Sequence, residues 1–462
     1  MSAAELARCG GTPVLTPQQV NAGIGSWPEV LPDDIDAVVE VLKSSHEPWG
    51  FMHPMVRGFQ RTYGEFVERS HCLAVATGTA ALHVAVAASG AEAGDEVITP
   101  ALGFVASATC VLHHNCIPVF ADVDPRTFNI DPEDVRRRIT PRTRAIIAVD
   151  LLGLPAPFDE LRAIADEHGL VLIEDAAQSQ GATYRGRRAG ALGDVSAMSI
   201  MASKNLPAAG EGGLLTTDDD QIWTRILGLA SQGMNPWDET VGGPRRIAYQ
   251  LGFNFRPTPT SFAFAWSQLT RLTRYQRASD ARVAAFEQAL GDAPLFAKPH
   301  VPEGSTHAWQ MYRLLVDPEA IGLGPQHAPH VRDAVMFLVR GEGGMCGFWD
   351  EVPLPAMRVF TERMGYGRGC PWRCHKSHVE YHPESYPVTR RVIDSGFIVP
   401  ITRATNDLDM VRRQEAYAKV AAHPEVVHDV ACKIAEAGSF SAWCGVDIRD
   451  ADGQRELTLP RP

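Results

Sequence analysis

An apolar run that ends on two acidic residues lies near the middle of the chain: Leu170-Val171-Leu172-Ile173-Glu174-Asp175-Ala176-Ala177-Gln178. Continuous runs of Leu, Ile and Val of this length are typical of strands that are buried on both faces of a parallel sheet. Such a strand delivers its last residues to the carboxyl edge of the sheet, where open α/β folds bind their ligands. The run therefore predicts a fold class and also a place for Asp175.

The same pattern repeats on both sides of this strand. Further strands are expected at 95–100, 118–122, 145–149, 195–200 and 213–217, and helices at 79–89, 106–114, 132–139 and 158–168. Alternating buried strands and helices predict an α/β domain with a mostly parallel sheet. The pattern loosens after residue 295. We therefore expect an N-terminal arm at 1–50 that wraps the large domain or a neighbouring subunit, a large domain at 51–295, and a small α+β domain at 296–462.

Composition and charge exclude several classes of function. The 462 residues carry 43 basic and 55 acidic side chains, and the net charge of −12 repels nucleic acids and anionic membranes. Two long uncharged stretches, 72–91 and 97–121, are broken by turn signals and do not predict membrane spans. The 9 cysteines, with no secretory signal ahead of them, predict reduced thiols in a cytoplasmic protein without disulfides.

Three polar features are expected at the carboxyl edge of the sheet. The amides of Gly78 and Thr79 and the Thr79 hydroxyl could bind an anion at a helix start, although a plain Thr N-cap is the alternative. Asp175 could keep a ring nitrogen protonated, or merely cap the next segment. Lys204 precedes the glycine-rich stretch 210–213, and a partly desolvated lysine can form a Schiff base, although most isolated lysines are solvated. Phosphate, ring nitrogen and aldehyde together predict pyridoxal 5'-phosphate (PLP) as the cofactor.

The stretch from about Val75 to Asp218 resembles the DegT/StrS-type sugar aminotransferase family, which belongs to fold type I of the PLP-dependent transferases (aspartate aminotransferase-like). The matching segments are 76–83, 94–100, 128–133, 174–178, and Lys204 with 210–213. The resemblance implies a large domain with a central, mostly parallel sheet, a smaller C-terminal α+β domain, and a homodimer with shared active sites.

The resemblance also implies a role for each matching residue. Lys204 corresponds to the lysine that binds the cofactor aldehyde and Asp175 to the partner of the pyridine nitrogen, so these two are the expected catalytic residues. The other expected cofactor contacts are Gly78, Thr79 and Ser199 at the phosphate, Phe104 stacked on the ring, Gln178 near the phenolic oxygen, and Asn254 reaching the phosphate of the other subunit. No metal is expected at this site.

Two short motifs favour one branch of the family, the scyllo-inosose aminotransferases of aminocyclitol antibiotic biosynthesis. They are residues 6–14, and Cys370-Pro371-Trp372 followed by 386–388. We expect transfer of an amino group from glutamine or glutamate to a ketone of a cyclitol or sugar. Departures from the family pattern at 150–153, 180 and 200–202 bear on the substrate rather than on the cofactor.

Three alternatives to this function remain open. The acceptor could be a nucleotide-linked keto-sugar, or the chain could be a PLP-dependent lyase or dehydratase on the same scaffold. A non-catalytic PLP-binding regulatory scaffold is the remote alternative, because the chain retains Lys204, Asp175, Thr79 and Phe104 together.

One further cluster could bind a metal. Cys370, Cys374, His375 and His378 have the spacing C-x3-C-H-x2-H, which is irregular for structural zinc. Core thiols and surface histidines are the favoured interpretation.

Overall fold

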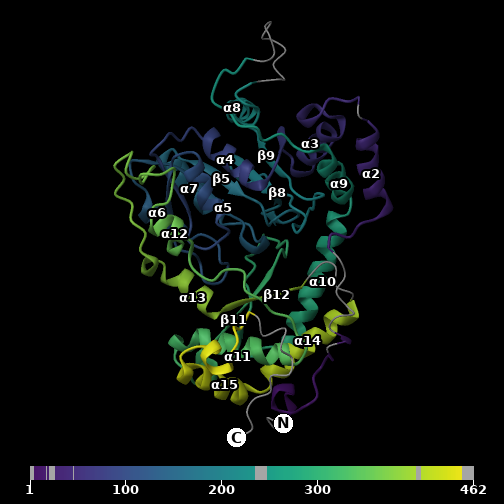
Figure 1. The fold of residues 1–462 in the computed structure, drawn as a ribbon, viewed down its shortest axis with the longest axis vertical. Coiled ribbons are helices and arrows are strands. Elements are labelled where there is room, and N and C mark those ends of the chain that lie inside the picture. The colour runs from purple at the N-terminus through teal and green to yellow at the C-terminus, as the bar shows by residue number, and fades with distance from the viewer. Residues whose placement is uncertain are drawn as a thin grey trace.

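The computed structural model describes residues 5–16, 18–19, 27–44, 46–234, 247–401 and 407–449. Figure 1 shows a large unit in the upper part, built around a broad sheet, and a small unit below it. Helix α10 (Leu272–Leu290) leads from the first unit to the second. The domain limits expected from the sequence stay a prediction.

The central sheet has seven strands in the order β1-β9-β8-β5-β4-β2-β3. Within it β9 runs antiparallel to β1 and β8, and the other neighbouring pairs are parallel. The six strands expected from the sequence are confirmed to within two residues, but β1 was not expected. The strands are β1 (His71–Val75), β2 (Glu96–Pro100), β3 (Ile117–Ala121), β4 (Thr143–Val149), β5 (Val171–Asp175), β8 (Val195–Ser199) and β9 (Gly213–Thr217), and a separate hairpin joins β6 (Thr183–Tyr184) to β7 (Arg187–Arg188).

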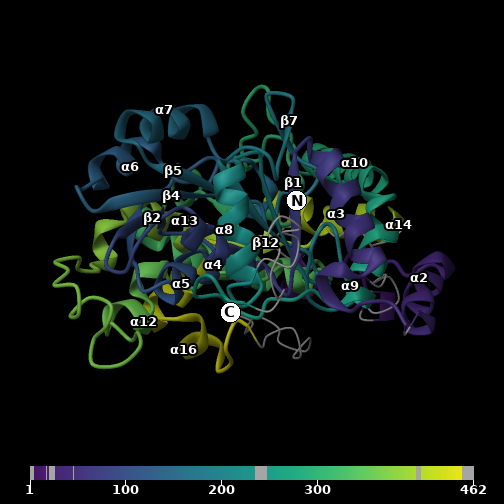
Figure 2. The ribbon, with the colours of Figure 1, turned by 90° about the horizontal axis from the view of Figure 1, so that it is seen from above.

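Helices cover both faces of this sheet, as Figure 2 shows from above. Side chains alternate along each buried strand. On β5, for example, Ile173 packs with the α4 side and Leu172 with the α7 side. One face carries α4 (Gly78–Ala88), α5 (Ala106–His113) and α8 (Asp220–Ala230), and the other carries α3 (Pro54–Val67), α6 (Pro132–Arg138), α7 (Phe158–His168) and α9 (Pro259–Leu269).

The small unit is built on a three-stranded antiparallel sheet with the order β10-β11-β12. Its strands are β10 (Phe296–Ala297), β11 (Tyr312–Val316) and β12 (Gly396–Val399), and its helices are α11 (Ala328–Gly341), α13 (Pro387–Ser395), α14 (Asp407–Ala421), α15 (Pro424–Ala437) and α16 (Phe440–Cys444). Between α11 and α13 the chain makes a long excursion, residues 342–386, that includes α12 (Arg358–Thr361).

The N-terminal arm is divided between the two units. Leu6 is buried in the core of the small unit, and the Ala7 amide donates to the Glu342 carboxylate at 2.6 Å. Helix α2 (Pro32–Lys43) instead packs on α9 of the large unit. The first part of the arm therefore lies against the small unit and the second part against the large unit. Whether the arm also contacts a neighbouring subunit stays a prediction.

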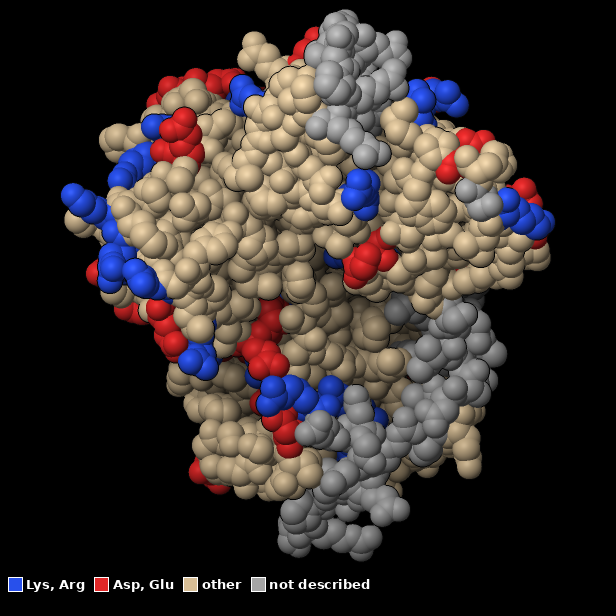
Figure 3. Space-filling model, turned by 45° about the horizontal axis from the view of Figure 1, so that its top comes forward, with Lys and Arg blue, Asp and Glu red and all other residues tan. Residues whose placement is uncertain are grey.

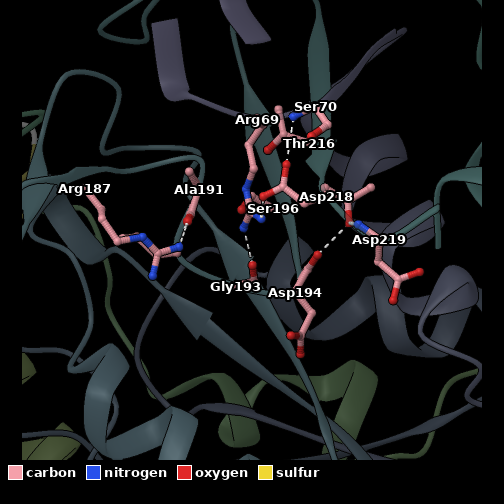
Figure 4. Close-up of polar contacts among 12 residues, drawn as sticks. Arg69, Ser70, Arg187, Ala191, Gly193, Asp194, Ser196, Thr216, Asp218 and Asp219 are labelled. Atoms are coloured by element: carbon pink, nitrogen blue, oxygen red, sulfur yellow. Dashed lines mark hydrogen bonds and ion pairs between the residues drawn. The ribbon is translucent and has the colours of Figure 1, made fainter. Parts of the chain in front are cut away.

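A polar network connects the loops at the amino edge of the central sheet (Figure 4). The Arg69 guanidinium donates to the Asp218 carboxylate at 2.6 Å and to the Gly193 carbonyl. The Thr217 hydroxyl donates to the Asp194 carbonyl at 2.7 Å. These contacts join β1, β8 and β9 through the loops that flank them.

The surface carries charges of both signs. On the face seen in Figure 3, basic and acidic side chains are interspersed around a largely uncharged expanse, and the surface is hollowed where the two units meet. In the described part of the chain, no helix combines the length and the apolar character that a membrane span needs.

The cysteine cluster of the excursion differs from expectation. Cys370 and Cys374 are joined in a disulfide with their Cα atoms 5.2 Å apart, so the prediction of reduced thiols throughout is wrong for this pair. The intervening turn brings the two residues within the Cα separation that a disulfide requires. His375 turns away, and its Nε2 lies 3.3 Å from Nδ2 of Asn115. Among the described residues no group of three potential ligands could hold a metal ion.

Candidate active site

A cavity of about 500 Å³ lies at the carboxyl edge of the central sheet. That volume is typical of sites that bind a small molecule or cofactor. Both units contribute to its lining, because the edge of the sheet meets loops of the small unit there. The lining includes Gly78, Thr79, Phe104, Ser107, Asp175, Gln178, Ser199, Lys204, Glu211, Gln310, Met311 and Trp349.

Asp175 reaches the cavity because of the pleat of β5. Successive side chains of a strand point to opposite faces, so Asp175 and its neighbour Glu174 separate. Glu174 accepts hydrogen bonds from the amides of Gly190 and Leu192, both at 2.7 Å, on the far face. Asp175 lies on the cavity side and is 3% exposed.

The Asp175 carboxylate is oriented by two donors. The Ser107 hydroxyl donates to Oδ2 at 2.6 Å and the Ala177 amide donates to Oδ1 at 3.1 Å. Burial raises the pKa of Asp175, although both hydrogen bonds and the charge of Lys204 act to lower it. A cation placed against this buried carboxylate would therefore be strongly stabilised.

The start of α4 forms the second wall. Thr77 is the N-cap, since its hydroxyl accepts from the Ala80 amide at 3.0 Å. The capping threonine is therefore Thr77, and Thr79 lies in the cavity lining. Gly78 has no space for a side chain, because a Cβ there would lie 2.5 Å from Cβ of Ser199. The helix start, Thr79 and Ser199 thus surround a place that suits an anion.

Lys204 lies on the loop that follows β8. The loop is closed by hydrogen bonds from the Ile200 amide to the Gly212 carbonyl at 3.0 Å and from the Ala202 amide to the Gly210 carbonyl at 2.8 Å. The Lys204 carbonyl accepts from the Trp27 indole at 3.2 Å. The loop is therefore held in place while the half-buried lysine side chain lines the cavity.

Phe104 and Gln178 also line the cavity. Phe104 is apolar but 58% exposed, so its side chain is accessible to a planar ligand. The Oε1 of Gln178 accepts from the Leu152 amide at 2.6 Å. The amide nitrogen is then the end of this side chain that can donate to a ligand.

Asn254 lies apart from these residues. It is exposed and pairs with Ser231 in an isolated bridge. Its neighbours Phe253 and Phe255 stack on each other, and the Phe255 carbonyl accepts from the Ala76 amide at 3.0 Å. The segment therefore borders the turn before α4 without bringing Asn254 into the cavity of its own chain, and its reach to another subunit stays a prediction.

Residues that depart from the family pattern make hydrogen bonds around the cavity. Gln180 donates to the Ser199 carbonyl at 2.7 Å and supports the end of β8. The turn 150–153 is hydrogen-bonded to the small unit. The Ala308 amide donates to the Gly153 carbonyl at 2.7 Å, and the Met311 amide donates to the Leu152 carbonyl at 3.2 Å. This turn therefore positions the loop that carries Gln310 and Met311.

The lining also contains residues that were not expected from the sequence, among them Ser107, Glu211, Gln310 and Trp349. Ser107 follows Phe104 by three positions, and Glu211 lies inside the glycine-rich stretch, so a signal was present for both. Gln310 and Trp349 come from the small unit. No local pattern marks them, since their place depends on how the two units pack.

The residues brought together fit PLP. A buried carboxylate, a half-buried lysine, an anion site without room for a Cβ and an exposed aromatic ring all line one cavity. The fold and this set of residues define a PLP-dependent enzyme of fold type I.

Comparison with known proteins narrows the class. The sequence model of the DegT/DnrJ/EryC1/StrS aminotransferase family matches residues 29–328. GDP-perosamine synthase of Caulobacter vibrioides is 39% identical over 256 residues, which cover 55% of this chain and 67% of that protein. L-glutamine:2-deoxy-scyllo-inosose aminotransferase of Micromonospora echinospora is 37% identical over 317 residues, or 66% and 74% of the two chains.

A solved structure agrees with both relatives. The aminotransferase from Psychrobacter cryohalolentis superimposes with a TM-score of 0.74 at 26% identity, and the match covers 87% of this chain and all of that one. The chain belongs to the DegT/DnrJ/EryC1/StrS aminotransferase family, and it is a PLP-dependent aminotransferase that acts on sugars or cyclitols.

Proposed function

We propose that this chain transfers an amino group from glutamine or glutamate to the ketone of a keto-cyclitol, an inosose, in the biosynthesis of an aminocyclitol. A nucleotide-linked keto-sugar is the second candidate acceptor. Relatives of both kinds match at similar identity, 37% for an inosose aminotransferase and 39% for GDP-perosamine synthase.

The charge of the cavity supports the cyclitol. Among the described residues that line it, Lys204 is the one cation, and Asp175 and Glu211 are acidic. A nucleotide diphosphate carries negative charges that binding sites usually meet with Arg or Lys. An uncharged cyclitol needs no such partner. Within the described lining of one chain, this scarcity of cations is the observation that supports the choice of acceptor.

The proposed roles follow from where each side chain lies. PLP supplies, when bound, an electrophilic aldehyde and a ring that withdraws electrons from the carbon next to the amine. Asp175 keeps a proton on the ring nitrogen, because its buried carboxylate is aligned by Ser107 and the Ala177 amide. Gly78, Thr79 and Ser199 hold the phosphate at the start of α4, where backbone amides point toward an anion.

Lys204 moves the proton. Its amine removes a proton from the carbon that bears the amino group of the donor, and in the second half-reaction it returns a proton to the carbon of the acceptor. Phe104 covers the ring of the cofactor and Gln178 donates to its phenolic oxygen.

We propose further that two chains form a homodimer with shared sites. The exposed position of Asn254, beside the turn that precedes α4, supports this proposal.

The decisive experiment presents the purified enzyme and glutamine with inososes and with nucleotide-linked keto-sugars. We expect the mass of an aminated cyclitol, together with stoichiometric oxo acid. Amination of nucleotide-linked sugars alone would overturn the choice of acceptor. Elimination products without oxo acid would instead point to a lyase.

A further inference from the structure

The excursion between α11 and α13 reaches the cavity through one residue. Trp349 is half-buried and lines the cavity, and it packs on the core of the large unit. It lies outside residues 29–328, the part that matches the family model. The side chain is therefore a feature of this C-terminal segment rather than of the matched core.

The backbone beside Trp349 is held by the small sheet. The Gly347 amide donates to the Ile398 carbonyl at 2.9 Å, and the Ile398 amide donates to the Gly347 carbonyl at 2.8 Å. Phe348 is partly buried and packs against the core of the small unit, with the Arg332 guanidinium 4.8 Å from the centre of its ring. Trp349, the next residue, packs instead on the core of the large unit, so the two neighbouring side chains contact different units and Trp349 is the one that lines the cavity.

A buried ion pair holds the other side of Trp349. Asp350 Oδ1 lies 2.5 Å from Nη2 of Arg313, and the Arg313 side chain is 1% exposed. Arg313 is on β11 opposite Ile398, the residue that pairs with Gly347. A buried charge without its partner strongly destabilises the folded chain, so Arg313 and Asp350 hold each other in place. Trp349 thus lies between two anchors, at Gly347 and at Asp350.

The position of Trp349 complements the groups assigned to the cofactor. Asp175, Ser199 and Lys204 come from the sheet edge, whereas Trp349 comes from the small unit. A polyhydroxylated ring has C–H faces that pack on a flat apolar surface, and an indole offers such a surface together with one N–H donor.

We propose that Trp349 determines acceptor specificity: its indole is the surface on which the acceptor ring lies, and Arg313 with Asp350 positions it. This inference rests on the proposed function. It predicts that Trp349 affects the second half-reaction, in which the acceptor binds, and does not affect the first.

The test separates the two half-reactions by single-turnover absorbance measurements. Glutamine alone converts the cofactor to its amine form, and an inosose then converts it back. We expect Trp349→Ala to raise the KM for the inosose about tenfold, equivalent to about 1.4 kcal/mol. The rate of the glutamine step should stay unchanged. Trp349→Phe, which keeps a flat ring, should restore most of the affinity.

Two further variants complete the test. Asp350→Asn should raise the KM for the acceptor in the same direction without changing the glutamine step. Val352→Ala, on the same segment but outside the cavity lining, should change neither half-reaction.

The outcomes distinguish the inference from the proposed function. An unchanged acceptor KM in Trp349→Ala, or equal loss in both half-reactions, would overturn the role of Trp349 while aminotransfer stands. A wild-type enzyme that converts its cofactor with glutamine but aminates no inosose would overturn the proposed acceptor.

Discussion

At the scale of single residues, one step along β5 separates two carboxylates. Glu174 is enclosed by backbone amides on one face, and Asp175 lies in the cavity on the other. The alternation of side chains therefore determines which acid can meet a ligand. In the proposed chemistry, the Asp175 carboxylate stabilises the protonated ring nitrogen of the cofactor. In the chain without cofactor, burial of this carboxylate destabilises the folded state.

Asp175→Asn should lower the transamination rate about 100-fold or more, because a neutral amide cannot stabilise a protonated ring nitrogen. Wild-type activity in this variant would contradict the role of Asp175. The measurement is kcat with saturating glutamine and acceptor.

The same variant predicts a change in stability with pH. Burial raises the pKa of Asp175 above its usual 3.8, so the folded chain holds this proton more tightly than the unfolded chain does. The contribution of Asp175 to the stability of the cofactor-free chain therefore falls as the pH rises from 3.8 through the raised pKa. Urea unfolding of Asp175→Asn without cofactor should show this part of the pH dependence removed. An unaltered pH profile would show that Asp175 is not destabilised by burial.

The sequence allowed this part of the site to be predicted because its residues lie at the ends of strongly apolar strands. Asp175 ends such a run and Lys204 follows one, and Ser199 was expected from the family resemblance; all three line one cavity. Asn254 has no such position in its own chain. Gln310 and Trp349 were missed because their place depends on packing between distant segments.

At the scale of elements, the start of α4 and the end of β8 are packed too closely for any residue but glycine. A Cβ on Gly78 would lie 2.5 Å from the Cβ and 2.9 Å from the Cα of Ser199. The helix start and the strand end therefore position each other. The short strand β1 was not expected, because His71 and Cys72 at its start are only half-buried and do not form an apolar run.

Gly78→Ala should weaken PLP binding and lower the free energy of unfolding by about 1–3 kcal/mol, since the added methyl group forces α4 and β8 apart. Thr77→Ala is the matched comparison. It removes the N-cap hydrogen bond, at about 1 kcal/mol, without a steric clash. Cofactor titration should separate the two variants. Equal PLP affinity in Gly78→Ala and the wild type would contradict the proposed phosphate site.

Helices α4 and α5 also carry a histidine cluster that predicts acid sensitivity. Burial, with His113 and His114 nearby, lowers the pKa of His83 to about 4. The unfolded chain then binds more protons between pH 6.5 and 4, so stability is lost as the pH falls through this range, by up to about 3 kcal/mol at pH 4. His83→Gln should flatten the unfolding free energy over this range. An equally steep curve in the variant would assign the acid sensitivity to other groups.

At the scale of the whole molecule, the cavity forms where the two units meet. The turn 150–153 receives the loop that carries Gln310 and Met311, and the excursion adds Trp349. The alternating pattern of the large unit was sufficient to predict its sheet. The arrangement of the small unit against it was not predictable from local patterns, because it depends on contacts such as the pair of Arg313 and Asp350.

The proposed dimer predicts that two inactive variants complement each other. Lys204→Ala and Asn254→Ala should each lose activity. A mixed dimer should contain one site with both native residues, so equal mixing after dissociation should restore about a quarter of the wild-type sites. No recovery after demonstrated exchange of subunits would contradict sites shared through Asn254.

The central claim is that the amine of Lys204 holds the cofactor. Sodium borohydride reduces the bond between PLP and the amine that binds it, which makes the attachment permanent, and peptide mapping then locates the label. The account predicts one labelled peptide with the pyridoxyl group on Lys204. A label on another lysine, or no label in enzyme saturated with PLP, would contradict it.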